Sequence, residues 1–166
     1  MKQIILISTL FLFVACSSDT KTSTDIPSKE STIDKKSDAV DNALTFINSY
    51  VDNCNKLKES ISVVEWVNSN QLATNHFKTE LEKMITEGNK VDPEMGLGVD
   101  PIFDAQDYPD EGFELDSFDS EANFIIVKGK NISDFKLTIK MMNENENWLV
   151  DGCGMINIPD DKKIKR

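Results

Sequence analysis

The most constraining feature of the sequence is a change of hydrophobic period part-way along the chain. From Val40 through Leu44 and Ile47 to position 57, apolar residues recur every three or four positions, which is the spacing of one face of an α-helix. Between residues 135 and 141, apolar and polar residues alternate, as in a strand with one buried face. This order predicts helices followed by an antiparallel sheet, which is an α+β fold.

The pattern also gives approximate positions for the expected elements. A first helix is expected at about residues 37–58, and a second begins at Thr74 as N-cap and ends near Gly88. Residues 62–68 fit either a helical turn or a strand. Strands are expected near residues 113–116, 123–127, 135–141 and 148–155, with polar turns between the later ones. We therefore predict N-terminal helices packed on a curved antiparallel sheet of three to four strands.

The first sixteen residues have the organisation of a bacterial export signal. Lys2 precedes a mostly apolar run at residues 4–14, and Ala15 lies directly before Cys16. The run is shorter than the roughly 20 residues that cross a bilayer as a helix. Residues 13–16 resemble the lipobox that precedes a lipidated cysteine. We expect residues 1–15 to be removed and acyl chains on Cys16 to anchor the mature chain to a bacterial envelope membrane. An ordinary secretory signal that ends near a cysteine is the alternative.

The composition after Cys16 predicts a tether, one domain and a tail. Residues 16–37 hold few large apolar side chains, so we expect a disordered tether that buries too little surface to fold. A single α+β domain is expected at residues 38–159. The end at residues 160–166 is basic, and it could contact anionic headgroups or remain a solvated terminus.

The net charge of the chain limits the classes of partner that it is expected to bind. The chain has a formal net charge of −11, which argues against nucleic acid. Residues 91–127 hold eleven acidic residues and no lysine or arginine. Such a stretch is either a solvated face or a surface that steers a cationic partner.

Four polar residues in the loop after the second helix are candidate contacts for a ligand or partner: Asp100, Asp104, Gln106 and Asp107. Paired carboxylates could also perform acid–base work, but the spacing does not match a calcium loop. The alternative is that these side chains satisfy backbone N–H groups in a loop broken by prolines. His76 is the only histidine in the sequence and is expected to be exposed, so we predict no metal and no cofactor.

Two cysteines remain after the expected lipidation of the first. Cys54 and Cys153 could form a disulfide, because an envelope compartment permits one. Each also occupies an apolar position of its expected element, where a free cysteine is a common core residue. The sequence leaves both alternatives open.

Three short strings resemble the bacterial family called domain of unknown function 3828, of small exported and lipid-anchored proteins. They are FINSY at residues 46–50, DPIFDAQD at residues 100–107 and WLVD at residues 148–151. The resemblance implies a cystatin-like cone of the nuclear transport factor 2 superfamily, with a pocket between the concave sheet and the first helix. The family has no agreed activity, so it implies no catalytic residues.

These observations favour a membrane-anchored binding domain that is not an enzyme. Its ligand would be a small molecule, a peptide or a cationic protein. An immunity-type inhibitor of a basic toxin or lytic enzyme is an alternative that the acidic stretch motivates. An enzyme that uses a pocket carboxylate such as Asp104 is a further alternative.

Overall fold

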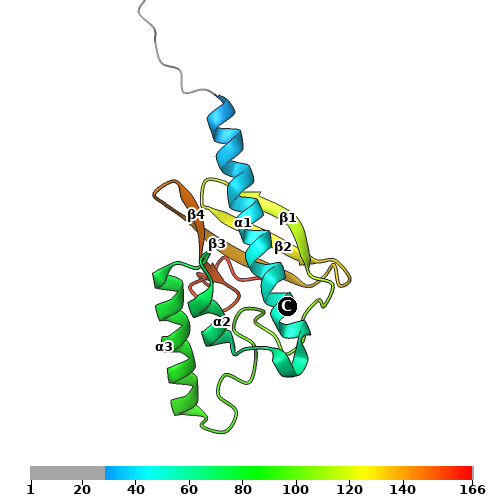
Figure 1. The fold of residues 1–166 in the computed structure, drawn as a ribbon, viewed down its shortest axis with the longest axis vertical. Helices are drawn as coiled ribbons and strands as arrows, with labels where there is room; N and C mark the ends of the chain where they lie inside the picture. The colour runs from blue at the N-terminus through cyan, green and yellow to red at the C-terminus, as the bar shows by residue number, and fades with distance from the viewer. Residues whose placement is uncertain (1–28, 166) are drawn as a thin grey trace, which may run out of the picture.

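The computed structural model describes the backbone of residues 29–165 and the side chains from residue 37 onward. Helix α1 lies across one face of a four-stranded antiparallel sheet, and the shorter helices lie side by side beyond the C-terminal half of α1 (Figure 1). The fold is therefore the predicted α+β arrangement of helices on an antiparallel sheet. The elements are α1 (Lys29–Asn55), η1 (Leu57–Glu59), α2 (Val63–Ser69), α3 (Asn75–Val91), β1 (Phe113–Asp119), β2 (Phe124–Gly129), β3 (Lys136–Glu144) and β4 (Asn147–Cys153).

The four strands form a meander in the order β1-β2-β3-β4. The turn between β3 and β4 has positive φ at both Asn145 and Glu146, as a two-residue type I′ hairpin requires. Register shifts interrupt the pairing of β1 with β2, where Asp116 is the extra residue on β1, and the pairing of β3 with β4, where Asp151 is the extra residue on β4. Such bulges bend and twist a strand, which accounts for the curvature expected of this sheet.

Helix α1 buries a face that overlaps the predicted one, although Val40 and Leu44 of the predicted stripe are only partly buried. Ile47 and Val51 are buried in one core with Ile125 and Ile139 of the sheet. Phe46, which the predicted stripe did not include, is fully buried with its ring against those of Trp66 and Phe77. The helix ends at Asn55, earlier than expected, because the chain turns there. The predicted helical residue Leu57 adopts a positive φ and is largely exposed.

The predicted tether at residues 16–37 is corrected at its C-terminal end. Helix α1 begins at Lys29, so residues 29–37 are helical rather than disordered. Residues 29–37 contain neither glycine nor proline, so nothing in this stretch breaks the helix. The predicted signal peptide, Cys16 and the rest of the tether lie outside the described residues. Within residues 29–165, no helix is long and apolar enough to span a bilayer.

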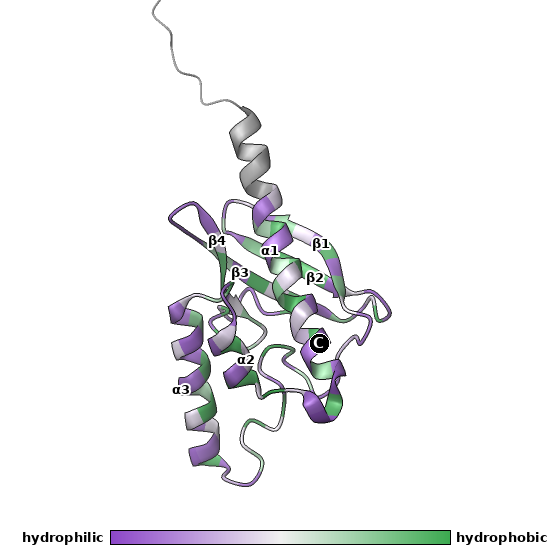
Figure 2. Ribbon diagram, in the orientation of Figure 1, coloured by the Kyte–Doolittle hydropathy of each residue, from purple (hydrophilic) through white to green (hydrophobic). Residues whose placement is uncertain are grey.

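Helices α2 and α3 begin at hydroxyl caps. Ser62 Oγ accepts the N–H of Glu65, which establishes residues 63–69 as a helix rather than a strand. Thr74 Oγ1 accepts the N–H of Phe77 at 3.0 Å, as predicted. On α3, hydrophobic residues lie on the side toward the rest of the domain, and hydrophilic residues face outward (Figure 2).

Helix α3 does not stop at Gly88 but continues to Val91. The glycine has a packing role instead, because a Cβ atom there would lie 2.7 Å from Leu97 Cδ2. The absence of a side chain therefore lets the following loop pack closely on α3. The chain leaves the helix at Asp92, whose N–H donates to the Gly88 carbonyl, and Pro93 follows.

The long connection from α3 to β1 is part of the core. Ile102 and Phe103 are buried, and the Phe103 ring stacks on Tyr108 with centroids 4.8 Å apart. Phe103 also contacts the rings of Tyr50 and Phe113. The loop is therefore fixed by its own aromatic side chains and can position a site.

The C-terminal segment is also docked, at least in part. Ile156 and Ile158 are buried, and the Lys162 carbonyl accepts a hydrogen bond from Thr138 Oγ1 at 2.7 Å. Lys162 Nζ lies 3.6 Å from a carboxylate oxygen of Asp119. The expected domain boundary at residue 159 is thus too early, because Lys162 belongs to the packed structure.

Candidate ligand-binding groove

An open groove of about 650 Å³ lies where the C-terminal end of α1 meets α3 and the loop that follows α3. Its walls come from four separate segments, and they combine apolar side chains with neutral polar ones. Asp100 is the single charged residue among the described residues that line it. The lining residues are Tyr50, Asn53, Cys54, Ser60, Ile61, Val63, Ile85, Asn89, Met95, Gly96, Leu97, Gly98, Val99, Asp100, Pro101 and Gln106.

Asp100 is held by three donors. Its Oδ1 accepts the N–H groups of Ile102 at 2.8 Å and Phe103 at 3.0 Å. Its Oδ2 accepts the hydroxyl of Tyr50 at 2.5 Å. The first two bonds form the side-chain turn that is typical of an aspartate ahead of a tight loop. The third bond ties the loop to α1, fifty positions earlier in the sequence.

The groups around Asp100 favour neutral forms. Burial raises the pKa of Asp100, and its hydrogen bonds from Tyr50, Phe103 and Ile102 oppose this rise without cancelling it. Burial and the nearby carboxylate of Asp100 raise the pKa of Tyr50 far above its ordinary value. The same two causes raise the pKa of Cys54 to about 11. Tyr50 and Cys54 are therefore neutral at physiological pH, and neither adds a negative charge beside Asp100.

The four predicted contact residues do not all reach the groove. Asp100 and Gln106 line it, and Gln106 Nε2 donates to the carbonyl of Gly98 at 3.2 Å. Asp104 does not line the groove and has a positive φ of 52°, a conformation that aspartate tolerates better than most residues. Asp107 is exposed on the turn beyond it. Asp100 thus accepts two backbone N–H groups of the loop, which is the role that the alternative interpretation gave it, whereas Gln106 donates to a backbone carbonyl instead.

The two cysteines are free thiols, so the disulfide that the sequence allowed is not formed. Cys54 is half-buried and lines the groove, whereas Cys153 is buried with its thiol 3.6 Å from the Ile102 carbonyl. Burial raises the pKa of Cys153. Cys54 lies on α1 and Cys153 lies on β4. Residues 100–103 of the loop contact both of these elements.

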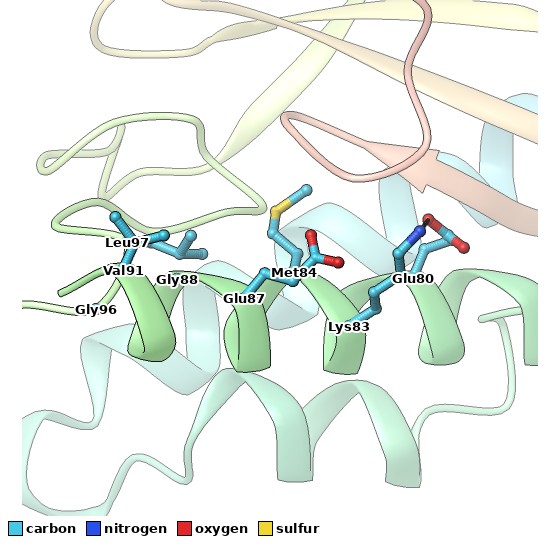
Figure 3. Close-up of a pocket in the computed structure, with 8 residues that line it drawn as sticks. All are labelled: Glu80, Lys83, Met84, Glu87, Gly88, Val91, Gly96 and Leu97. Atoms are coloured by element: carbon cyan, nitrogen blue, oxygen red, sulfur yellow. Dashed lines mark ion pairs between the residues drawn. The ribbon is translucent and has the colours of Figure 1, made fainter. Parts of the chain in front are cut away.

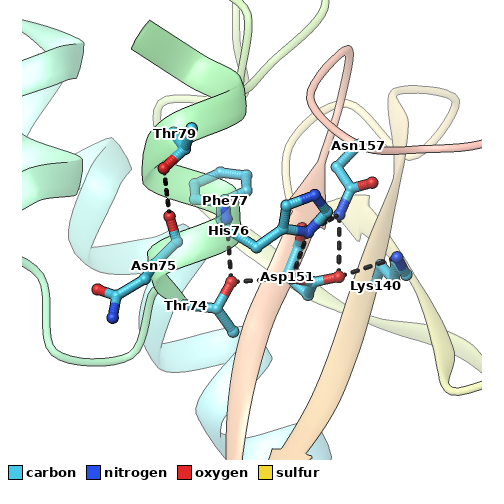
Figure 4. A network of polar contacts seen from close by, with 8 residues as sticks. All are labelled: Thr74, Asn75, His76, Phe77, Thr79, Lys140, Asp151 and Asn157. Atoms are coloured by element: carbon cyan, nitrogen blue, oxygen red, sulfur yellow. Dashed lines mark hydrogen bonds and ion pairs between the residues drawn. The ribbon is translucent and has the colours of Figure 1, made fainter. Parts of the chain in front are cut away.

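A second polar cluster centres on Asp151, whose side chain is 0% exposed. Thr74 Oγ1 donates to its Oδ1 at 2.8 Å, and His76 Nδ1 lies 3.1 Å from the same oxygen. Lys140 Nζ lies 2.8 Å from Oδ2, and Asn157 Nδ2 donates to Oδ2 at 2.9 Å. Figure 4 shows these side chains converging on the carboxylate from α3, β3 and the C-terminal segment. The cluster therefore joins the start of α3 to the sheet.

Sequence reasoning did not find this cluster. Thr74 was expected to cap α3, and Asp151 was noted in the last strand, but nothing in the spacing linked them. His76 is half-exposed, with 52% of its side chain accessible, yet one ring nitrogen is engaged by Asp151. Burial raises the pKa of Asp151, but hydrogen bonds from Lys140, Thr74 and His76 bring it below its ordinary value. The Asp151 carboxylate is therefore charged at neutral pH.

A smaller hollow of about 400 Å³ runs along α3 beside Leu97 (Figure 3). Met84 and Leu97 form its apolar part, and Glu80, Lys83 and Glu87 lie along its helical side. Leu97 also lines the larger groove, so the two hollows adjoin at this residue. Among the side chains of residues 37–165, no group of three histidine, cysteine or acidic residues could hold a metal ion.

Comparison with known proteins returns no family model, no curated protein and no solved structure that matches this chain. The resemblance to domain of unknown function 3828 therefore stays a prediction.

Proposed function

We propose that the chain is a bacterial envelope lipoprotein with a non-enzymatic binding domain, whose ligand occupies the groove that contains Asp100. The observation that supports this proposal is the lining of the groove: one carboxylate among apolar and neutral polar side chains. Ligand sites commonly combine a mostly apolar concave surface with a few fixed polar groups. The volume of about 650 Å³ also falls in the usual range for such sites.

The residues that form the walls of the groove are held in place by packing and by hydrogen bonds. Tyr50 lies on α1 and is buried against the ring of Trp66, with centroids 4.8 Å apart. Asn53 holds the α1–α2 connection by exchanging two hydrogen bonds with the backbone of Ile61. Polar groups on a rigid scaffold lose little entropy when a ligand binds. The proposal assigns no catalytic role, because Asp104 and Asp107 lie outside the groove.

Attachment to the envelope is the part of the proposal that rests on sequence. Residues 1–15 would be removed, and lipid on Cys16 would hold the chain to a membrane. In membrane fractionation, we expect the wild type in the membrane pellet at mature size. A Cys16→Ala variant is expected to be unprocessed or released. A variant that pellets with membranes at mature size would contradict the lipid anchor.

Binding in the groove can be tested by hydrogen exchange of the full chain, with and without a detergent extract of bacterial envelopes. We expect slower exchange at residues 95–106 when the ligand is present. A Gln106→Trp replacement should fill the groove and remove that protection. The matched control is Gln71→Trp, because Gln71 is an exposed glutamine that does not line this groove. Protection elsewhere, or protection that survives Gln106→Trp, would contradict the proposed site.

A further inference from the structure

Asp100, which is partly buried, differs from the fully buried carboxylate of Asp151 in lacking a cation. Asp151 has the Lys140 ammonium group 2.8 Å away. Asp100 has no ion pair within the described part of the chain, and its side-chain partner is the neutral hydroxyl of Tyr50. A partly buried carboxylate without a counter-charge costs free energy that a cation would recover. The groove therefore offers an ionised Asp100 no counter-charge among its described lining residues.

The carboxylate retains room for one more donor. An ionised carboxylate offers about four acceptor positions, and Asp100 uses three, for Ile102, Phe103 and Tyr50. The remaining position belongs to Oδ2, because Oδ1 already accepts two N–H groups. An ammonium or guanidinium group could fill it with a charge-assisted hydrogen bond.

The rest of the groove suits the aliphatic part of such a ligand. Val63, Ile85 and Leu97 line it with branched apolar side chains. Lysine and arginine bury their aliphatic stems along surfaces of this kind and keep only the head polar. A small free cation without a stem would leave these side chains uncovered.

Features at the mouth of the groove favour a polypeptide over a free small molecule. Met95 and Ile61 line the groove and are also exposed, by 67% and 38%. They provide apolar contacts for residues on either side of an inserted side chain. The loop of residues 92–112, part of which lines the groove, has seven acidic residues and no basic ones, which attracts a basic polypeptide at a distance.

We infer that the groove binds a lysine or arginine side chain presented by another polypeptide, with its cationic head on Asp100 and its stem against the apolar wall. This inference rests on the proposed function and specifies its ligand. The neighbours of the basic residue in the partner would be apolar, to cover Met95 and Ile61.

The test uses full-length chain in detergent and two synthetic pentapeptides, Ala-Leu-Arg-Leu-Ala and the same peptide with citrulline in place of arginine. Citrulline has nearly the same shape without the charge. Binding is followed by amide NMR shifts, which also locate the site. We expect shifts at residues 95–106 and at least tenfold tighter binding of the arginine peptide. Asp100→Asn should abolish that preference, and Glu146→Gln, an equal charge change on the distant β3–β4 turn, should retain it.

A second variant tests the role of charge without replacing Asp100, so the test does not depend on the folding of Asp100→Asn. Met95→Lys adds a positive charge at an exposed position on the rim, so it should leave the core intact. We expect it to weaken the arginine peptide at least fivefold more than the citrulline peptide, because both peptides lose the same apolar contact and only the arginine peptide is repelled by the added charge.

Three results would overturn the inference. Equal binding of both peptides in the groove would remove the role of charge and leave the proposed binding function intact. Agmatine that binds as tightly as the arginine peptide would assign the groove to a free small amine. Absence of shifts with either peptide would overturn the inference, and the hydrogen-exchange experiment with envelope extract then decides the proposed function separately.

Discussion

Replacement of Asp151 by asparagine should cause a large loss of stability, because four donors converge on a fully buried carboxylate. An asparagine amide can accept from Thr74 and His76 through its oxygen. Its NH2 group would then face the ammonium of Lys140 and the Nδ2 of Asn157, which are both donors. The ammonium would lose its counter-charge while 28% exposed.

The size of the effect follows from that burial. Removing one partner of a buried ion pair costs about 3–5 kcal/mol, and the partial exposure of Lys140 places this case near the lower end, at about 3 kcal/mol. With a urea m-value of about 2 kcal/mol per M, the unfolding midpoint should fall by about 1.5 M. The control is Glu114→Gln, which breaks the exposed pair with Lys128 at 3.4 Å and should cost less than about 1 kcal/mol.

The assay is urea unfolding followed by circular dichroism, at pH 7 and at lower pH. Because the folded-state pKa of Asp151 lies below its ordinary value, its contribution is present above the unfolded pKa of about 3.9. That contribution is lost as the pH falls through the folded pKa. The gap between wild type and Asp151→Asn should therefore narrow below about pH 4. If Asp151→Asn loses no more stability than Glu114→Gln at pH 7, the cluster does not hold α3 to the sheet.

Three further predictions concern the loop and the cysteines. Asp100→Asn should be at least as stable as the wild type at pH 7, because the raised pKa of Asp100 means that ionisation of this residue lowers the stability as the pH rises. In urea unfolding, the difference between the two proteins should vanish at about pH 4. A large loss of stability in the variant at pH 7 would contradict this reasoning. Phe103→Ala should lower the free energy of unfolding by about 3–5 kcal/mol, because the ring is buried among other aromatic rings; a loss below 1 kcal/mol by the same assay would show that the loop is not part of the core. Mass spectrometry after alkylation of the unfolded, unreduced chain should find Cys54 and Cys153 both modified, whereas a cross-linked peptide containing the two would refute the free thiols.

Local patterns predicted the elements that one stretch of sequence can specify. The spacing of Val40, Leu44 and Ile47 identified the side of α1 that faces the core, although only Ile47 of the three is fully buried, and the alternation in residues 135–141 identified β3. The Thr74 cap needs only the N–H three residues later. In each case the decisive interaction is either local or satisfied by any apolar surface, so the sequence carries it directly.

The site required contacts between distant residues. Tyr50 and Asp100 are fifty positions apart, and Thr74 and Asp151 are separated by even more of the chain. The sequence indicated Asp100 as a residue of the loop, but no local signal distinguished it from Asp104. The difference is the hydroxyl of Tyr50, which lies on the face of α1 that the loop covers, and that contact exists only after the loop has packed.

The 27 residues of α1 correspond to a rod about 40 Å long, at 1.5 Å per residue. Tyr50, Asn53 and Cys54 form part of the groove at one end of this rod, and the rod begins at Lys29 at the other. A chain fixed by its N-terminus would thus hold its binding surface at a stand-off set by the helix itself. Deleting seven residues, about two turns, from the segment before residue 37 would shorten that reach by roughly 10 Å and keep the groove in nearly the same rotational phase.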